Sequence, residues 1–586
     1  MSRPVGARDP GLPSPNPTLE DRRRAIRRRR IGAGAVLLVV VLAIALVLVS
    51  SGNGSARREA AQFMRAWEHG DYAAMYRLLD TDSQGRTSEQ AFAGAYRGDA
   101  RVATMSSLRA AGPIGSASGG ALEAPVSVHT RIFGTFHEHV LIPITGSGSS
   151  ARVAWNRTLL FPGLQAGETL SRNTMLPPRA SLLARDGSIL ASGPAQTGSR
   201  YSSLGSVALP VIGEVGPIPS AERDALEAQG VPPDAILGTS GLELTFDAQL
   251  RGQPGGQLFA GRRVLASSHP VPSGPVRTSI DPALQNSAVQ ALGGQYGGVV
   301  VLRPSDGQIL AVAGLGVDDT QPPGSTFKMV TVTGVLQYRV ATPSTEFPYA
   351  TEALLDGVPL QDANGEDCGG TLAYAFAVSC NSVYAPLGAK LGAARLSAVA
   401  EAYGFNHPTG IPGTVESTFP TAGELNSDLA VGSAAIGQDE DLASPLEMAL
   451  VATTIADGGR RPPLSFLDGP PHIATRVTSP HVAHEIRAMM ELVVSEGTGT
   501  AAQIPGVVVA GKTGTAELTT TASCAPGASN CSSSSNPQDT DAWFAAFAPA
   551  IHPKLAVCVM LVADGAGGNT AAPIARQILQ EGLQVL

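Results

Sequence analysis

The pattern of hydrophobic and polar positions changes several times along the chain. Its first feature is a long apolar run that predicts a membrane-spanning helix. Residues 31–50 read IGAGAVLLVVVLAIALVLVS and contain no charged side chain. At ~1.5 Å per residue, such a helix crosses the ~30 Å hydrocarbon layer of a bilayer. Seven arginines lie between positions 22 and 30 and no similar cluster follows, so we expect a disordered cytoplasmic tail over residues 1–30 and an extracytoplasmic remainder. A cleaved signal peptide is the alternative, although its apolar core is usually shorter.

Helical spacing followed by alternation predicts a small α+β domain over residues 55–160. The helical positions are Ala60, Phe63, Met64 and Trp67. Asp71 is the expected N-cap of a second helix. The alternating stretches are residues 124–133, 137–146 and 151–160. The histidines here are typical of a strand surface, because no second cluster completes a metal site: His129, His137 and His139.

The later part of the chain divides into a spacer and a large α+β domain. Residues 161–275 are rich in Gly and Pro, with short strands and no evident chemistry. From residue 276 to 586 helices and strands alternate, which predicts pairing between strands that are distant in sequence. This region opens with a helix capped by Asp281 and two strands joined by a turn at residues 304–307, and it ends with two strands and a helix.

Length and charge narrow the class of protein. At 586 residues the chain is long enough for about four domains, and 43% hydrophobic with 15% charged residues is ordinary for globular structure. The net charge is −8, and residues 1–30 carry nine Arg against three acidic residues, or +6, so the rest sums to −14. No basic patch remains outside the tail, which argues against nucleic-acid binding.

The five cysteines all lie in the last 220 residues of the chain, in a region that we expect to be oxidising. Cys524 and Cys531 share a loop rich in Ser, Gly and Pro and are the favoured disulfide. A bridge between Cys368 and Cys380 is a second candidate, with less support from the sequence. Cys558, within LAVCVMLV, is predicted to be a buried strand thiol.

Lysine is rare in this chain, with four residues against thirty-seven arginines, so each retained lysine is a candidate for chemistry. Unlike Arg, a desolvated Lys can lose its proton. In QPPGSTFKMV, residues 321–330, Ser325 is expected to begin a helix that brings its hydroxyl within hydrogen-bonding reach of Lys328. Free N–H groups at the helix start would suit an oxyanion. The pair fits a nucleophile and its base, provided that burial and a neighbouring cation lower the lysine pKa.

Two further motifs follow in order. Ser379 and Asn381, in VSCNSV, offer a hydroxyl that can pass a proton to a leaving group and a carboxamide that can hold Lys328 and a substrate amide. A plain helix cap or turn is the alternative for this short motif.

The third motif, VVVAGKTGTAE, reads as a strand that starts near residue 507. Lys512 would supply positive charge for a substrate carboxylate and lower the pKa of Lys328. Thr513 continues the strand, and Gly514 leaves room for another backbone to lie close against its edge. The backbone N–H of Thr515 would be the second oxyanion donor. An ordinary edge strand would not explain why the other two motifs precede it.

Together these motifs resemble those of a class B penicillin-binding protein. FMRAWEHGDYAAMYRLL is similar to the NTF2-like N-terminal domain of the methicillin-resistance type, and PPRASLLARDGSILA with LGTSGLELTFDAQLRGQPG resembles the pedestal or dimerisation domain. IGQDEDLASPLEMA and GTGTAA resemble segments that flank the family's site. Ala180 stands where the family usually has Gly, and the loop with Cys524 and Cys531 lengthens the segment after the K-T-G strand.

The resemblance implies a multidomain α+β fold. After the transmembrane anchor at residues 31–50 come an NTF2-like domain (55–160), an elongated, mainly β pedestal domain (161–275) and a transpeptidase domain (276–586), whose serine β-lactamase-like fold has an antiparallel sheet flanked by helices. It also implies a D,D-transpeptidase that cross-links peptidoglycan stem peptides through a Ser325 acyl-enzyme, releases D-Ala, and is acylated by β-lactams.

The resemblance also implies partners and a location. We expect a D-Ala-D-Ala donor and an amine acceptor as substrates, a slow D,D-carboxypeptidase side activity, a SEDS-type glycan polymerase as membrane partner, and a single-pass protein whose catalytic domain lies outside the cell membrane. Such enzymes serve cell shape or cell division. The sequence contains no metal cluster, phosphate loop or dinucleotide fingerprint, so we infer no metal and no cofactor.

The alternatives to a transpeptidase are one other enzyme and two kinds of non-catalytic protein. A serine β-lactamase needs a general base for deacylation, and in AGELN, residues 422–426, Ala422 occupies the position of that glutamate. A non-catalytic β-lactam sensor would need a signalling domain across the membrane, and a division scaffold would have no reason to keep every motif residue. All three are less favoured than the transpeptidase.

Overall fold

The computed structural model describes residues 54–117, 121–467, 469, 473–517 and 540–585. The expected tail and membrane helix lie outside these ranges, as do Cys524 and Cys531. No helix within the described ranges is both long and apolar enough to cross a bilayer. The described residues form two compact units, the first within residues 54–175, 224–231 and 254–269 and the second within residues 176–223, 232–253 and 270–585.

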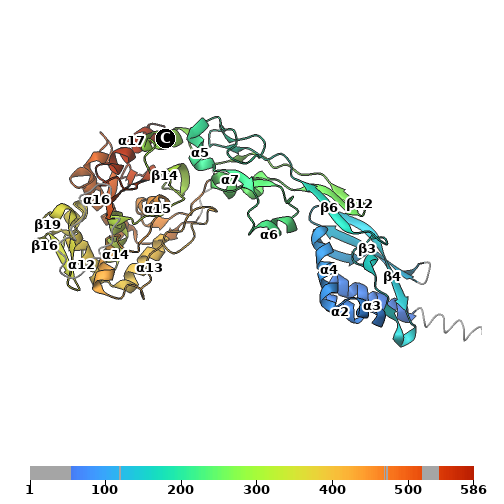
Figure 1. Cartoon of the computed structure of the whole chain (residues 1–586). Helices are drawn as coiled ribbons and strands as arrows, with labels where there is room; N and C mark the ends of the chain where they lie inside the picture. The colour runs from blue at the N-terminus through green and yellow to red at the C-terminus, as the bar shows by residue number, and fades with distance from the viewer. Residues whose placement is uncertain (1–53, 118–120, 468, 470–472, 518–539, 586) are drawn as a thin grey trace, which may run out of the picture. The chain divides into compact units, whose positions relative to one another are not determined.

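The first unit packs helices against an antiparallel sheet, and Figure 1 shows α2, α3 and α4 grouped beside β3 and β4. Its helices are residues 54–68, α2 (Tyr72–Arg77), α3 (Thr81–Arg86) and α4 (Glu89–Val102). The sheet has the order β1-β3-β4-β5, with β2 paired to β3. Its strands are β1 (Met105–Ala110), β2 (Gly115–Ser116), β3 (Ala121–Thr130), β4 (Thr135–Thr145) and β5 (Arg152–Val153). Alternate residues of β3 face the helices and are buried, as the sequence pattern predicts.

Local capping explains where these elements start and stop. The Asp71 carboxylate accepts a hydrogen bond from the backbone N–H of Ala74 at 2.8 Å, which confirms the predicted N-cap. The third predicted strand is mostly wrong, since only two of its residues pair. The Asn156 side chain accepts the N–H of Thr158 and starts a 3-10 turn, so a local side-chain bond replaces the sheet ladder there.

The histidines of this unit lie on β3 and β4, as predicted, and bond to neighbours on the same sheet. His129 contacts Thr135 at 2.8 Å, His137 contacts Ser127 at 2.9 Å, and His139 lies 3.0 Å from Glu123.

The predicted spacer, residues 161–275, contributes to both units. Its β6 (Leu170–Met175), β11 (Gly255–Ala260) and β12 (Arg263–Ser268) form a sheet of order β12-β11-β6 in the first unit. Helix α6 (Arg223–Ala228) also lies within residues 161–275. Its elements in the second unit are short: β7 (Leu182–Leu183), β8 (Ile189–Ala191), α5 (Leu209–Ile212), β9 (Val215–Pro217), β10 (Ile236–Gly238), α7 (Gly241–Thr245) and α8 (Asp247–Leu250).

A buried charge cluster joins these short elements of the second unit. The Glu243 carboxylate, 1% exposed, accepts hydrogen bonds from Arg179 at 2.7 Å and Arg200 at 2.9 Å. Asp247 accepts from Arg179 and from Arg251, each at 2.7 Å. We call these five residues the arginine cluster. Because every buried charge in it faces an opposite charge, the cluster avoids the large cost of an unpaired buried ion.

The core of the second unit is a five-stranded antiparallel sheet of order β15-β14-β24-β23-β22. Its strands are β14 (Gly297–Arg303), β15 (Gln308–Gly314), β22 (Ala510–Glu517), β23 (Thr540–Ala548) and β24 (Leu555–Leu561). Val299 and Val301 pack with α9 (Pro282–Leu292) and α17 (Ala571–Val585), whereas Val300 and Leu302 pack with the helices on the other face. Burial on both faces explains why β14 is an unbroken apolar run.

The remaining elements of this unit surround the sheet or extend from it. The helices are α10 (Lys328–Gln337), α11 (Leu372–Ala377), α12 (Asn381–Leu391), α13 (Ala393–Tyr403), α14 (Asp428–Ala435), α15 (Pro445–Ala456) and α16 (Pro480–Ser495). The short strands are β13 (Val276–Arg277), β16 (Glu346–Ala350), β17 (Glu352–Leu355), β18 (Val358–Gln361), β19 (Cys368–Thr371), β20 (Arg460–Arg461) and β21 (Thr475–Arg476). The Asp281 cap, the β14–β15 hairpin, the last two strands and the final helix are all as predicted.

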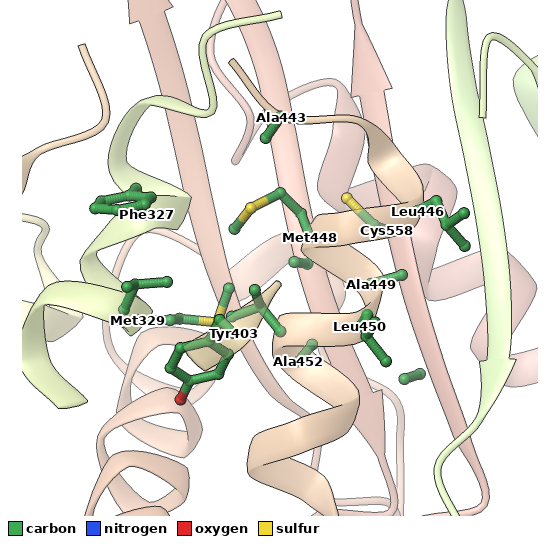
Figure 2. Close-up of a cluster of buried hydrophobic side chains, with 14 of the residues drawn as sticks. Phe327, Met329, Tyr403, Ala443, Leu446, Met448, Ala449, Leu450, Ala452 and Cys558 are labelled. Atoms are coloured by element: carbon green, nitrogen blue, oxygen red, sulfur yellow. The ribbon is translucent and has the colours of Figure 1, made fainter. Parts of the chain in front are cut away.

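Helix α15 packs between the sheet and the segment that carries Lys328. Figure 2 shows Met448 reaching from α15 toward Phe327 and Met329, while Leu446 points to the other side. Cys558 of β24 belongs to the same core and is a buried free thiol, which confirms the prediction for this cysteine. Phe327 also stacks on Phe419, with ring centroids 4.9 Å apart. This close packing fixes the turn that presents Ser325.

Candidate active site

Ser325 lies in a tight turn whose other side chains are buried. Residues 324–327 form a 3-10 turn and α10 starts at Lys328, so the serine precedes the α-helix instead of opening it. Thr326, Phe327 and Lys328 are fully buried, whereas Ser325 is partly exposed. Gly324 has φ +50°, and a Cβ there would lie 2.7 Å from the carbonyl oxygen of Thr515. The turn therefore contacts the K-T-G strand directly and offers one hydroxyl to solvent.

Lys328 makes the hydrogen bond to Ser325 that the S-x-x-K spacing predicts. Its Nζ lies 2.9 Å from Ser325 Oγ, 2.7 Å from the Ser379 carbonyl oxygen and 2.7 Å from Asn381 Oδ1. The Asn381 amide nitrogen donates to the carbonyl oxygen of Gln361 at 2.8 Å, so its oxygen must face the lysine. Of the four oxygens around Nζ, the two at 2.7 Å can only accept a hydrogen bond, and the fourth, the Ser379 hydroxyl, is more distant at 3.4 Å. A neutral amine fills those two with N–H groups and points its lone pair at the Ser325 hydroxyl.

Burial supplies the electrostatics for a neutral lysine. Desolvation lowers the pKa of Lys328 to about 7, and the nearby Asp362 carboxylate opposes that shift. The expected repulsion between Lys328 and Lys512 is present, but it acts on Lys512, whereas burial dominates at Lys328. Burial and then the positive charge of Lys328 hold the pKa of Lys512 well below its usual value.

Ser379 and Asn381 approach the lysine from the start of α12. Ser379 has φ +68°, a conformation that is strained for a non-glycine residue. Its Oγ lies 2.9 Å from Lys512 Nζ and 3.4 Å from Lys328 Nζ, so this hydroxyl bridges the two amines. Cys380 between them forms a disulfide with Cys368, the pairing that the sequence favoured less. The disulfide ties the S-x-N segment to β19.

The K-T-G motif lies on β22, which starts at Ala510 and not near residue 507. Lys512 is fully buried, and its Nζ also donates to the Thr513 carbonyl oxygen at 2.9 Å. The Thr513 hydroxyl lies 2.5 Å from that of Thr498, in the GTGTAA segment. A Cβ on Gly514 would lie 2.8 Å from the Pro323 carbonyl oxygen and 2.9 Å from Trp543. The backbone close to Gly514 is therefore the turn before Ser325.

Asp362 is a site residue that the sequence analysis missed. It is 2% exposed, and its Oδ1 accepts the backbone N–H groups of Asn381 and, at 3.1 Å, Ser382. Asp362 belongs to no short motif and lies 19 residues before Asn381 in a polar stretch, so spacing gave no signal for it. Its carboxylate caps α12 and fixes the position of Asn381, which in turn contacts Lys328.

Comparison with known proteins agrees with this arrangement. A family model described as the penicillin binding protein transpeptidase domain matches residues 297–580. The penicillin-binding protein dimerisation domain matches residues 194–262, and the NTF2-like N-terminal transpeptidase domain matches residues 55–168.

Relatives and solved structures match over most of the chain. The peptidoglycan D,D-transpeptidase PbpA of Mycolicibacterium smegmatis is 33% identical over 59% of this chain and 80% of its own. The D,D-transpeptidase domain of a peptidoglycan glycosyltransferase from Eggerthella lenta is 27% identical, with TM-score 0.56, over 70% of this chain and 98% of its own. The penicillin G acyl-enzyme of penicillin-binding protein A from M. tuberculosis is 26% identical, with TM-score 0.53, over 70% of this chain and 100% of its own. The chain belongs to the class B penicillin-binding proteins, with an NTF2-like, a dimerisation and a transpeptidase domain.

Proposed function

We propose that the chain is a serine-type peptidoglycan D,D-transpeptidase that β-lactams inhibit by acylating Ser325. The observation that carries the proposal is the 2.9 Å contact between a partly exposed serine hydroxyl and a fully buried lysine whose two shortest contacts, at 2.7 Å, are to oxygens that only accept hydrogen bonds. This is the arrangement that a nucleophile and its base require. The relatives named D,D-transpeptidases and the solved penicillin-binding protein acyl-enzyme support the same activity.

Acylation starts from neutral Lys328. Ser325 Oγ attacks the penultimate D-Ala carbonyl carbon of a stem pentapeptide while its proton passes to Lys328 Nζ. The C–N bond to the terminal D-Ala then breaks, and the leaving amine receives a proton through Ser379 Oγ, which both lysine amines contact. The products are an ester on Ser325 and free D-Ala.

Deacylation reverses the proton path. An amine of a neighbouring stem peptide attacks the ester carbon, its proton returns to Ser325 Oγ, and a new amide cross-links the two peptides. Water in place of the amine gives slow carboxypeptidase activity. The backbone N–H groups of Ser325 and Thr515 would hold the oxyanion in both steps, and Lys512 with Thr513 would bind the substrate carboxylate.

A β-lactamase would need a base for the deacylating water. Glu424, in the segment that resembles the lactamase motif, is exposed and accepts hydrogen bonds from the N–H and hydroxyl of Thr421. Among the described residues, no carboxylate makes a hydrogen bond or ion pair with Ser325 or Lys328. This supports slow release of the acyl group and a covalent trap for β-lactams.

We further propose a single-pass protein anchored by residues 31–50, with the catalytic domain outside the cell membrane. The uncharged run and the arginines before it support this orientation. We also propose a SEDS-type glycan polymerase as membrane partner, because the three matched domains include no glycosyltransferase and a transpeptidase needs a source of glycan.

The test is labelling of the full chain with fluorescent penicillin. Wild type should form an adduct that persists, and Ser325→Ala should form none, while the exposed Ser344→Ala serves as the matched control. A donor peptide ending in D-Ala-D-Ala should release D-Ala, with a cross-linked product when an acceptor amine is added. Equal labelling of Ser325→Ala would refute the assignment of the nucleophile, and rapid loss of the adduct would favour a lactamase.

A further inference from the structure

Asp362 occupies an unusual position for a carboxylate. It follows β18 directly, and the same short segment provides both groups that fix Asn381: the Gln361 carbonyl oxygen accepts the side-chain amide, and Asp362 accepts the backbone N–H. Asn381 Oδ1 in turn contacts Lys328 Nζ at 2.7 Å. A single residue thus separates the Asp362 carboxylate from the candidate base.

The second oxygen of this carboxylate is buried and contacts no hydrogen-bond donor among the described residues. Burying a carboxylate is costly unless charge or hydrogen bonds compensate for it. Two N–H groups at the start of α12 compensate in part, and a nearby cation would complete the compensation. The structure therefore places a buried negative charge where a positive charge on Lys328 would be favoured.

We propose that Asp362 is a positioning residue for the Ser325–Lys328 pair. It holds Asn381 so that the amide oxygen faces Lys328, and its negative charge stabilises the ammonium that forms when Nζ takes the Ser325 proton. The step leaves net charge unchanged: the hydroxyl loses a proton, the amine gains it, and the carboxylate stays ionised. This inference rests on the proposed function, since it concerns the same proton transfer.

The other groups around Lys328 act differently. Lys512, on β22, is a second buried amine that shares Ser379 Oγ with Lys328 and repels it when both are charged. The Tyr384 ring of α12 lies 5.7 Å from Lys328 Nζ and offers only a weak attraction. Asp362 is therefore the acidic group whose charge acts on this lysine.

The decisive variant is Asp362→Asn, because an amide oxygen can still accept both N–H groups while the charge is gone. We measure the rate of acylation of the full chain by fluorescent penicillin across pH. The rate above the acidic limb should fall about tenfold, and the midpoint of the limb should move down by about one pH unit, as expected for loss of a close opposite charge. Asp362→Glu, which keeps the charge, should hold the midpoint near that of wild type.

The matched control is Asp281→Asn, which makes the same change at the N-cap of α9, away from the site. It should leave both rate and midpoint unchanged. A second readout needs no activity: with 13C-labelled lysine the four lysines of the chain give few NMR signals, and that of Lys328 should titrate at lower pH in Asp362→Asn.

The outcomes separate this inference from the proposed function. An unchanged pH midpoint and lysine titration in Asp362→Asn, even with a lower melting temperature, would reduce Asp362 to a helix cap and overturn the inference alone. A wild-type chain that forms no penicillin adduct would overturn the proposed function and this inference together.

Discussion

The second unit contains two buried clusters of positive charge that are built in opposite ways. In the arginine cluster, Arg179 and Arg200 are held by Glu243 and Asp247 in hydrogen-bonded ion pairs. In the active site, Lys328 and Lys512 are equally buried, but hydroxyl and carbonyl oxygens hold them, and no carboxylate contacts either amine among the described residues.

The difference teaches what each cluster can do. Arginine keeps its proton at any relevant pH, so a fully paired arginine cluster is fixed in charge and serves to hold loops together. A buried lysine surrounded by neutral acceptors gains little from its charge and can release the proton. The chain thus separates permanent charge, which stabilises, from titratable charge, which reacts.

The largest effect should come from making the active site resemble the arginine cluster. Lys328→Arg keeps a cation but removes the base, because guanidinium does not deprotonate near neutral pH. Acylation by penicillin should fall ~10²–10⁴-fold, the usual range for loss of general-base catalysis. The exposed Lys390→Arg is the control and should acylate normally. Acylation of Lys328→Arg at the wild-type rate would exclude Lys328 as the base.

Removing the acid from the arginine cluster should cost stability instead of activity. Glu243→Ala leaves the buried Arg200 without a carboxylate partner and Arg179 with Asp247 alone, so we expect a loss of about 3–5 kcal/mol in the free energy of unfolding. Urea denaturation measures it. Asp457→Asn, which breaks a pair with the half-exposed Arg460, should change little. Equal effects of the two substitutions would contradict the role given to burial.

Removing the Cys368–Cys380 disulfide should weaken the segment that positions Ser379 and Asn381. Cys368 and Cys380 close a loop of 12 residues, for which the chain-entropy model gives about 3 kcal/mol. Replacing both by Ala should lower the free energy of unfolding by about that amount and slow acylation, because Ser379 and Asn381 flank Cys380. The Cys558→Ala variant is the control for loss of a thiol. A double variant with wild-type stability and rate would show that packing alone holds the segment.

The smallest effect is a pH dependence that the arginine cluster lacks. Since the pKa of Lys328 is lowered to about 7, acylation should fall about tenfold for each pH unit below 7 and level off above it. Added salt should hardly move the midpoint, because burial is the main cause. The same pKa shift makes stability depend on pH. Between pH 7 and 10.5 the unfolded chain binds more protons at Lys328 than the folded chain does, so the contribution of this lysine to the free energy of unfolding rises with pH.

Local chemistry explains why much of the molecule could be predicted. Asp71 and Asp281 cap helices because their side chains bond to N–H groups two or three residues away, and the β14–β15 hairpin needs only a short turn. Predictions failed where local and distant effects compete. The stretch 151–160 alternates like a strand, but Asn156 turns the chain, and Ser325 was expected to open a helix that starts three residues later.

The sequence by itself determined the residue types of the site and the 2.9 Å contact between Ser325 and Lys328, because three residues of a helical turn fix that geometry. Only the tertiary structure decided the rest. The Ser379 hydroxyl contacts Lys512, 133 residues later in the chain, because α12 and β22 pack against the same core, and Cys368 bonds to Cys380 because that core places them close together. Burial, which lowers the lysine pKa, and the nearness of Asp362 are properties of packing, and no spacing along the chain encodes them.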